Sequence, residues 1–150
     1  MATEYLNNKA FTAMIHRFRD AKEKLEKSNS KKNKKEFEES QLELATAFYT
    51  LANNIIRAFK FNMIDKDDAL QEGVLICFDK LHRFDENRGN CFAFFTQIQC
   101  NHYKQLYRTA KNYNELKVRY LKHIISKNKE MSKIKSRKKH NNHKKYENDD

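Results

Sequence analysis

The scarcity of helix-breaking residues is the feature that most constrains the fold of this 150-residue chain. It contains no proline and only two glycines, Gly73 and Gly89. Turn-rich β-sandwiches and glycine-rich nucleotide-binding loops need glycine or proline at fixed places. Eleven Phe and seven Tyr residues are enough to seed a modest core. The sequence therefore predicts an all-α protein, a compact helical bundle of one domain.

Apolar residues recur at helical spacing in five segments. The predicted helices span residues 9–26, 37–59, 66–83, 91–109 and 113–125. Asp65 is expected to cap the third of them, because its side chain can accept from the free backbone N–H groups of the first turn. Residues 85–90 are expected to form a loop. In the last helix, Leu116, Tyr120, Leu121 and Ile124 are expected to point inward.

This periodicity divides the chain into four parts. Residues 1–26 form an N-terminal helix, and residues 27–36 contain no apolar side chain, which predicts a solvated linker. Residues 37–125 form the main helical domain. Residues 126–150 contain few apolar side chains and are expected to be a mobile basic tail.

Positive charge is concentrated towards the C-terminal end. The net charge is +11, and residues 104–150 hold 15 Lys or Arg against 5 Asp or Glu, whereas residues 1–103 hold 16 against 15. Segregated positive charge is typical of a surface that binds nucleic-acid phosphates, with an acidic membrane surface as the rival partner. No apolar run exceeds five residues and no signal peptide is evident, so we expect a cytoplasmic protein without a membrane anchor.

Metal, redox and catalytic sites are not indicated. Cys77, Cys91 and Cys100 follow no zinc-binding spacing and are expected to be reduced and mostly buried. A nuclease metal site would need clustered carboxylates, and Asp65, Asp67, Asp68 and Glu72, with no paired site elsewhere in the sequence, make weak candidates for it. We expect no cofactor and no enzymatic activity.

The middle of the chain resembles conserved region 2 of bacterial sigma factors, the initiation subunits of RNA polymerase. The resemblance rests on Asp-Ala-Leu-Gln-Glu-Gly at residues 68–73, then Phe84, Arg88-Gly89 and Phe92 in one register, and it covers residues 37–110. The chain is also similar to the short late-transcription sigma factors of T-even-type bacteriophages. That similarity rests on Asn7, Asn8 and Lys9, on the pattern formed by Asn90, Phe92, Ala93, Thr96 and Gln97, and on the short length.

The resemblance implies two sets of site residues. The RNA polymerase-binding set, expected to dock on the coiled coil of the largest subunit, is Asp68, Gln71, Glu72 and Phe78. The set expected to read and open promoter DNA begins with Phe84, Arg88 and Phe95, which match the family's pocket for a flipped adenine. It continues with Phe92, Ile98, Gln99, His102, Lys104, Gln105, Arg108 and Lys111. Both Phe92 and Phe95 are equally compatible with a plain core role.

Two functions follow as expectations. The first is a sigma factor that binds core RNA polymerase and directs promoter recognition and melting at an AT-rich element, for phage late genes, in the cytoplasm of an infected bacterium. The alternative is a basic DNA- or RNA-binding regulatory or packaging protein that does not bind RNA polymerase. The resemblance to the phage factors raises the question of a sliding-clamp contact through the last residues, 144–150, and the sequence leaves open whether the clamp or a phage co-activator is a further partner.

Overall fold

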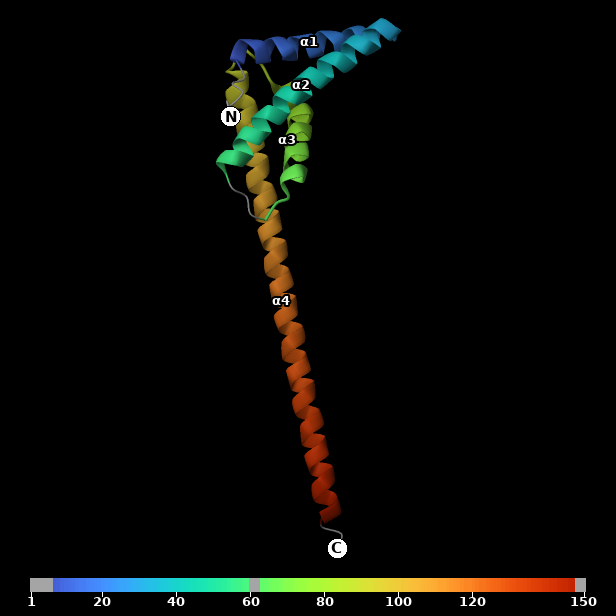
Figure 1. Ribbon diagram of the computed structural model, residues 1–150, viewed down its shortest axis with the longest axis vertical. Coiled ribbons are helices and arrows are strands. Elements are labelled where there is room, and N and C mark those ends of the chain that lie inside the picture. Colours follow the sequence, from blue (N-terminus) through green and yellow to red (C-terminus); the bar gives the residue numbers. More distant parts are fainter. Residues whose placement is uncertain (1–6, 60–62, 148–150) are drawn as a thin grey trace. The chain divides into compact units, whose positions relative to one another are not determined.

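The computed structural model describes the backbone of residues 7–59 and 63–147 and the side chains of these residues as far as 143. This described part is helical, without a strand, which confirms the all-α prediction. The helices are α1 (Asn8–Lys27), α2 (Lys31–Ala58), α3 (Lys66–Lys80) and α4 (Cys91–Glu147), with a short 3-10 helix η1 (Leu81–Arg83) after α3 (Figure 1). Two compact units divide the chain: Met1–Arg108, which contains the bundle, and Thr109–Asp150.

Polar side chains begin each helix. Asp65 Oδ1 accepts from the backbone N–H groups of Asp67 and Asp68 at 2.9 and 3.1 Å, which confirms the predicted cap. Asn90 Oδ1 accepts from the N–H of Phe92 at 2.8 Å and starts α4 directly after the predicted loop. Such caps satisfy N–H groups that have no partner within the helix.

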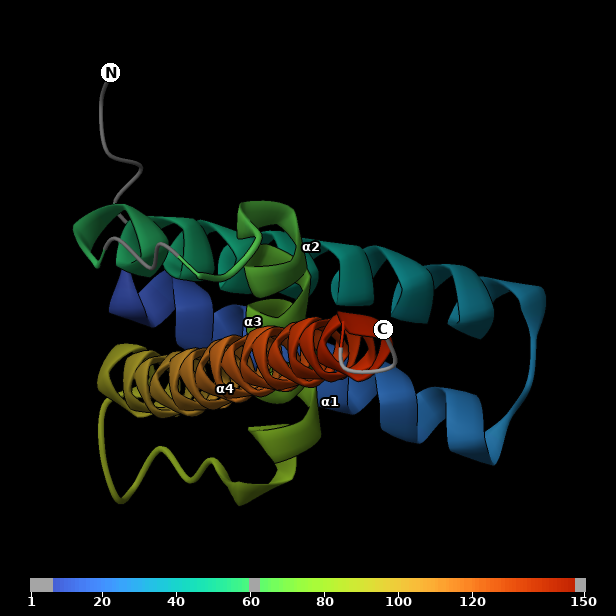
Figure 2. The ribbon, with the colours of Figure 1, turned by 90° about the horizontal axis from the view of Figure 1, so that it is seen from below.

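The predicted linker is mostly helix. Only residues 28–30 separate α1 from α2, which lie side by side as a helical hairpin (Figure 2). Ser30 caps α2, and the Asn33 side-chain amide donates to the Ser28 carbonyl at 2.9 Å, which holds the turn closed. The four lysines and the one glutamate of residues 31–36 need no buried face to be helical, because they are good helix formers and continue a helix that is nucleated by its buried part.

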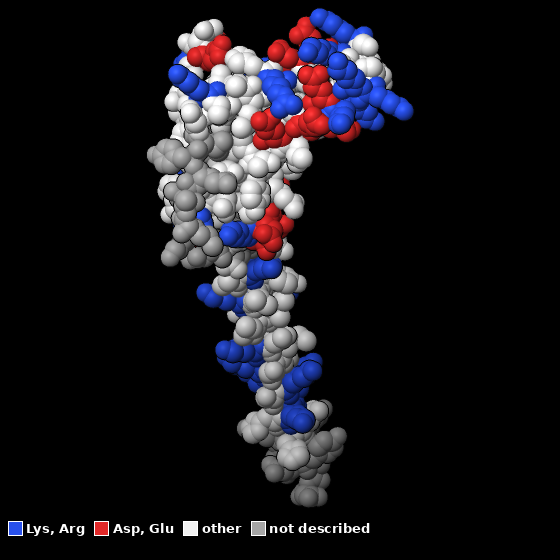
Figure 3. All heavy atoms as spheres, turned by 45° about the horizontal axis from the view of Figure 1, so that its top comes forward, with Lys and Arg blue, Asp and Glu red and all other residues white. Residues whose placement is uncertain are grey.

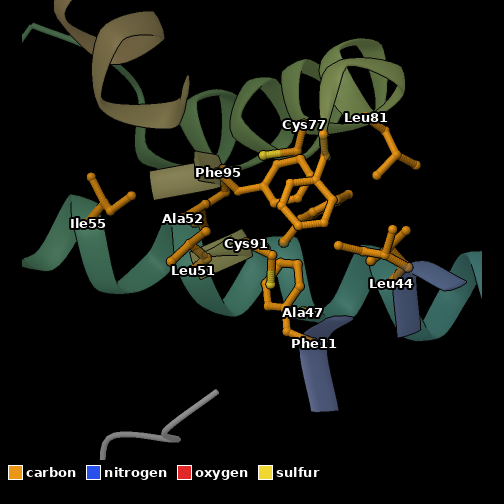
Figure 4. Packing of buried hydrophobic residues seen from close by; sticks show 14 of the residues in the cluster. Phe11, Leu44, Ala47, Leu51, Ala52, Ile55, Cys77, Leu81, Cys91 and Phe95 are labelled. Carbon is orange, nitrogen blue, oxygen red and sulfur yellow. The ribbon is translucent and has the colours of Figure 1, made fainter. Parts of the chain in front are cut away.

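All four helices contribute to one core. Phe11 of α1, Phe48 of α2 and Phe95 of α4 are fully buried, with ring centroids 4.9 to 5.7 Å apart. Figure 4 shows Phe11, Leu44, Leu51, Cys77 and Phe95 converging between the helices. The predicted apolar face of α2 is confirmed from Leu44 to Ile55, whereas Phe59 is exposed. α1 is therefore part of the bundle and not a separate N-terminal element.

The chain after residue 109 differs from the prediction. No break separates the two helices expected at 91–109 and 113–125, and helix continues through the expected mobile tail to Glu147. The intervening Thr-Ala-Lys-Asn sequence contains no glycine or proline to end a helix. Leu116, Tyr120 and Leu121 are 57 to 64% exposed and Ile124 is half-buried, so the inward orientation predicted for them is wrong.

The cysteines give a test of core packing. Burial raises the pKa of the Cys77 thiol to about 12, with the Gln99 side chain opposing the shift, and raises the pKa of Cys91 and Cys100. A raised pKa means that less thiolate, the reactive form, is present at pH 8. Cys100 is the only one of the three that is partly exposed.

We expect iodoacetamide at pH 8 to label Cys100 first and Cys77 only after denaturation, measured by peptide mass spectrometry. Labelling of Cys77 at the rate of Cys100 in the folded protein would contradict this packing.

Candidate nucleic-acid and protein interfaces

The aromatic residues expected to form a base pocket belong to the core. Phe84 is 5% exposed and Phe95 0%, and their ring centroids are 5.6 Å apart with Phe94 packed against both. From α1, the Arg19 guanidinium donates to the carbonyls of Leu81 and Phe84 at 2.8 Å and lies over the Phe84 ring. The prediction that Phe84 and Phe95 line a base pocket with Arg88 is therefore wrong for this structure. The faces of both rings pack against other side chains and leave no room for a base.

Gln99 is also part of the interior. Its side chain is fully buried, and Nε2 donates to the carbonyls of Phe48 and Gly73 at 3.1 Å. Beside it, the hydroxyl of the buried Tyr103 donates to the Ala69 carbonyl at 2.9 Å. These hydrogen bonds join α2, α3 and α4. Gln99 therefore positions helices, and the prediction that its side chain contacts DNA is wrong for this structure.

A groove lies between α3–η1 and the first part of α4, with a volume of about 290 Å³. It contains three of the residues predicted to bind DNA: Ile98, His102 and Gln105. Five further lining residues, which sequence reasoning missed, are Ile76, Lys80, Arg83, Phe94 and Asn101. Lysine and arginine suit phosphates, amides suit base edges, and apolar rings suit unstacked bases. We call this the basic groove.

His102 lines the basic groove and also contacts a residue of the predicted polymerase-binding set. Its Nε2 lies 3.0 Å from Glu72 Oε2, and the His102 side chain is only 19% exposed. Glu72 belongs to the predicted polymerase-binding set, whereas His102 belongs to the predicted DNA-binding set. The two predicted sets therefore meet at this contact between α3 and α4.

The other predicted DNA contacts lie on the surface. The Arg88 side chain is 89% exposed, with Nε 3.7 Å from Asp85 Oδ2, and Phe92 is 42% exposed. Lys104 and Arg108 are exposed on α4 in the first unit, and Lys111 is exposed in the second. None of these side chains contributes to the basic groove's lining.

The predicted polymerase-binding residues divide in the same way. Asp68, Gln71 and Glu72 are exposed, whereas the Phe78 ring packs 5.0 Å from Phe48 and belongs mainly to the core. A second groove, of about 460 Å³ between α2 and α3, adjoins this exposed face. We call this second groove the apolar groove. It is lined by Ala45, Thr46, Tyr49, Gln71, Val74 and Leu75.

Tyr49 and Leu75 were not predicted as site residues. Tyr49 is 49% exposed on α2 and Leu75 is 63% exposed on α3, and both line the apolar groove. The signal was present in the sequence, since each lies outside the apolar stripe that predicted its helix. Exposed apolar side chains gathered in a groove indicate a binding surface.

Neither a metal-binding cluster nor a membrane-spanning helix is found among the residues that the structure describes. No group of three or more His, Cys, Asp or Glu side chains there is arranged to hold a metal ion, and this includes the carboxylates of α3. None of the described helices combines the length and the apolar character needed to cross a bilayer. The C-terminal residues that raised the question of a sliding clamp, 144–150, lie outside the described side chains.

Comparison of the chain with protein-family models, with curated proteins and with solved structures gives no match.

Proposed function

We propose that this chain is a sigma factor that binds core RNA polymerase and directs it to an AT-rich promoter element, for the late genes of a bacteriophage. The observation that carries the proposal is that α3 contributes to two grooves of opposite character. Gln71, Val74 and Leu75 line the apolar groove, whereas Ile76 and Lys80 line the basic groove. One short helix thus joins a surface suited to a protein with a surface suited to nucleic acid.

The apolar groove and its acidic neighbours suit a protein partner. Asp68 and Glu72 are exposed on α3 beside exposed Leu75, and residues 62–86 carry seven acidic against three basic residues. Apolar area supplies affinity, and the carboxylates select a basic partner surface. These positions coincide with the motif that resembles the polymerase-binding part of sigma factors.

The basic groove suits an unpaired strand. Lys80 and Arg83 stand on one wall, where they can hold phosphates, and Phe94 and Ile98 supply apolar surface on which a base can rest. The amides of Asn101 and Gln105 offer both donors and acceptors to base edges. In this account Phe84, Phe95 and Gln99 act only by positioning the walls of the groove.

Charge reversal on α3 tests the protein interface. We expect Gln71→Ala with Glu72→Arg to weaken binding to core RNA polymerase at least tenfold in a fluorescence anisotropy titration, with a far-UV circular dichroism spectrum like that of the parent protein. The lost contact between Glu72 and His102 joins a side chain that is 49% exposed to one that is 19% exposed, and it stabilises the fold by about 1 kcal/mol. The matched control is Gln41→Ala with Glu38→Arg, two exposed positions on α2. Equal affinity of the α3 variant and the control would contradict the assignment.

Neutralisation of the basic groove tests the nucleic-acid interface. Lys80→Gln with Arg83→Gln should lower the affinity for a single-stranded AT-rich oligonucleotide. The slope of log affinity against log salt should become shallower by about 1.4, because each lost phosphate contact removes about 0.7. Lys31→Gln with Lys32→Gln, at the exposed start of α2, is the matched control and should leave the slope unchanged. An unchanged slope in the groove variant would exclude Lys80 and Arg83 from phosphate binding.

A basic nucleic-acid-binding protein without a polymerase partner is the second candidate. It is favoured by the second unit, where residues 109–143 carry eleven Lys or Arg against two acidic residues. Every residue in this range is exposed except Ala110 and Ile124, which are half-buried. Figure 3 shows lysine and arginine side chains along this unit. The two candidates differ in one measurement. A sigma factor co-purifies with core RNA polymerase in the absence of DNA, whereas the alternative does not.

A further inference from the structure

The second unit, Thr109–Asp150, carries a cluster of large apolar side chains on its surface. In residues 113–125, six large apolar side chains are 44 to 64% exposed. They are Tyr113, Leu116, Val118, Tyr120, Leu121 and Ile125. An apolar cluster of this density on a surface indicates a binding site. We call residues 113–125 the apolar segment.

The spacing of these residues suits recognition as a helix. Tyr113, Leu116 and Tyr120 fall at positions i, i+3 and i+7, and half-buried Ile124 follows at i+11. Residues at this spacing lie on one helix face. An amphipathic helix with anchors at these positions is one of the recurring ways in which a protein groove binds a partner.

The charges around the apolar segment define the chemistry of its partner. Lys117 Nζ lies 4.7 Å above the Tyr113 ring, within the apolar face itself. Arg119 and Lys122 also lie within the segment and Lys111 precedes it, whereas Glu115 is the only acidic residue within it. A partner surface that complements this helix is apolar with an acidic rim.

Other occupants fit these observations less well. A second copy of the helix would place like charges together, since residues 109–143 carry eleven Lys or Arg against two acidic residues. A helix that lies in a membrane interface carries its lysines on the polar face, whereas Lys117 lies over Tyr113 within the apolar face. Duplex nucleic acid keeps its apolar base faces stacked against one another, out of reach of leucine, valine and isoleucine side chains, although its phosphates suit the cations beside them.

We propose that the apolar segment docks as a helix into an apolar groove with an acidic rim on core RNA polymerase, as a second attachment in addition to α3. This inference rests on the proposed function. The segment lies beyond residues 37–110, the part of the chain that resembles sigma factor region 2. Two attachments on one chain raise its overall affinity, because the second forms at high effective concentration once the first is made.

The test compares full-length variants for binding to purified core RNA polymerase. Leu116→Gln with Ile124→Gln removes two anchors and retains helix-forming residues. Lys129→Gln with Lys133→Gln is the matched control, since both lysines are exposed on the same helix outside the segment. The Gln71→Ala with Glu72→Arg variant reports on α3. Duplex DNA, vesicles of neutral and anionic phosphatidyl lipids, and sedimentation of the free protein serve as the other probes.

We expect the Leu116→Gln with Ile124→Gln variant to bind core polymerase at least tenfold more weakly than the parent, and the lysine control to change the affinity less than threefold. Binding of the segment variant to duplex DNA should be unchanged. Circular dichroism spectra of all variants should overlay, because the substituted side chains are exposed or half-buried.

Several outcomes would overturn the inference. If the segment variant binds polymerase as tightly as the parent while the α3 variant binds weakly, the proposed function stands and the second attachment does not. If the parent binds vesicles and the segment variant does not, the occupant is a membrane. If the parent sediments as a dimer and the segment variant as a monomer, the occupant is a second copy. If the parent does not bind core polymerase, both the proposed function and the inference are wrong.

Discussion

Replacing Gly73 with alanine is expected to lower the free energy of unfolding by about 2 to 3 kcal/mol, because an added methyl group would overpack the interior. A Cβ atom there would overlap the Tyr103 hydroxyl and would lie 3.0 Å from Tyr103 Cζ and 3.1 Å from Ala52 Cβ. Tyr103 is fully buried and hydrogen-bonded to Ala69, so its ring has little room to move. Alanine's better helix propensity, about 1 kcal/mol, opposes the overpacking only in part. Urea unfolding followed by circular dichroism measures the difference.

Two companion variants separate sterics from other effects of the substitution. Gly89→Ala adds a methyl group where no atom lies within 4 Å and should change stability by less than about 0.5 kcal/mol. Tyr103→Phe removes the overlapping hydroxyl and should restore part of the stability when combined with Gly73→Ala. A Gly73→Ala protein as stable as the parent would show that α2, α3 and α4 approach less closely than described.

Truncation of Phe95 is expected to cost about 3 to 5 kcal/mol of stability, the range for a phenylalanine lost from a core. Its ring is fully buried against the rings of Phe11, Phe48, Phe84 and Phe94. This loss is a large fraction of the 5 to 15 kcal/mol typical of a folded domain. Thermal and urea unfolding measure it. Any loss of promoter activity in Phe95→Ala should follow the unfolded fraction and recover on cooling.

Phe92 provides the matched control for Phe95, since it lies one turn earlier on α4 and is 42% exposed. We expect Phe92→Ala to cost less than about 1 kcal/mol. If Phe95→Ala is as stable as Phe92→Ala but opens promoter DNA poorly, Phe95 contacts the DNA directly, and the buried position described here does not represent the active protein.

The bundle was largely predictable because its helices bury regular apolar stripes. The positions of Leu44, Ala47, Phe48 and Leu51 at helical spacing were enough to assign α2 and its inner face. The cap at Asp65 was predictable for a similar reason, since local side-chain chemistry determines it. By contrast, residues 31–36 bury almost nothing, so an apolar pattern gave no indication that they continue α2.

The candidate site was harder to predict, because burial depends on tertiary neighbours. Phe84, Phe95 and Gln99 have side chains suited to DNA, yet they pack against residues from other helices. Conversely, Lys80 and Arg83 join Ile98 and His102 only because η1 approaches the first part of α4. The apolar stripe of residues 113–125 predicted a helix correctly, but periodicity alone does not distinguish a face buried within the chain from one that awaits a partner.

Run-off transcription measures directly whether this protein acts as a sigma factor. Core RNA polymerase and an AT-rich supercoiled template are incubated with and without the protein, the start sites are mapped, and protein retained on the polymerase is quantified in the same reaction. We expect discrete new starts that require the protein and are lost in the variant with Gln71→Ala and Glu72→Arg. No new starts, together with no retention of the protein on core polymerase, would contradict the proposed function.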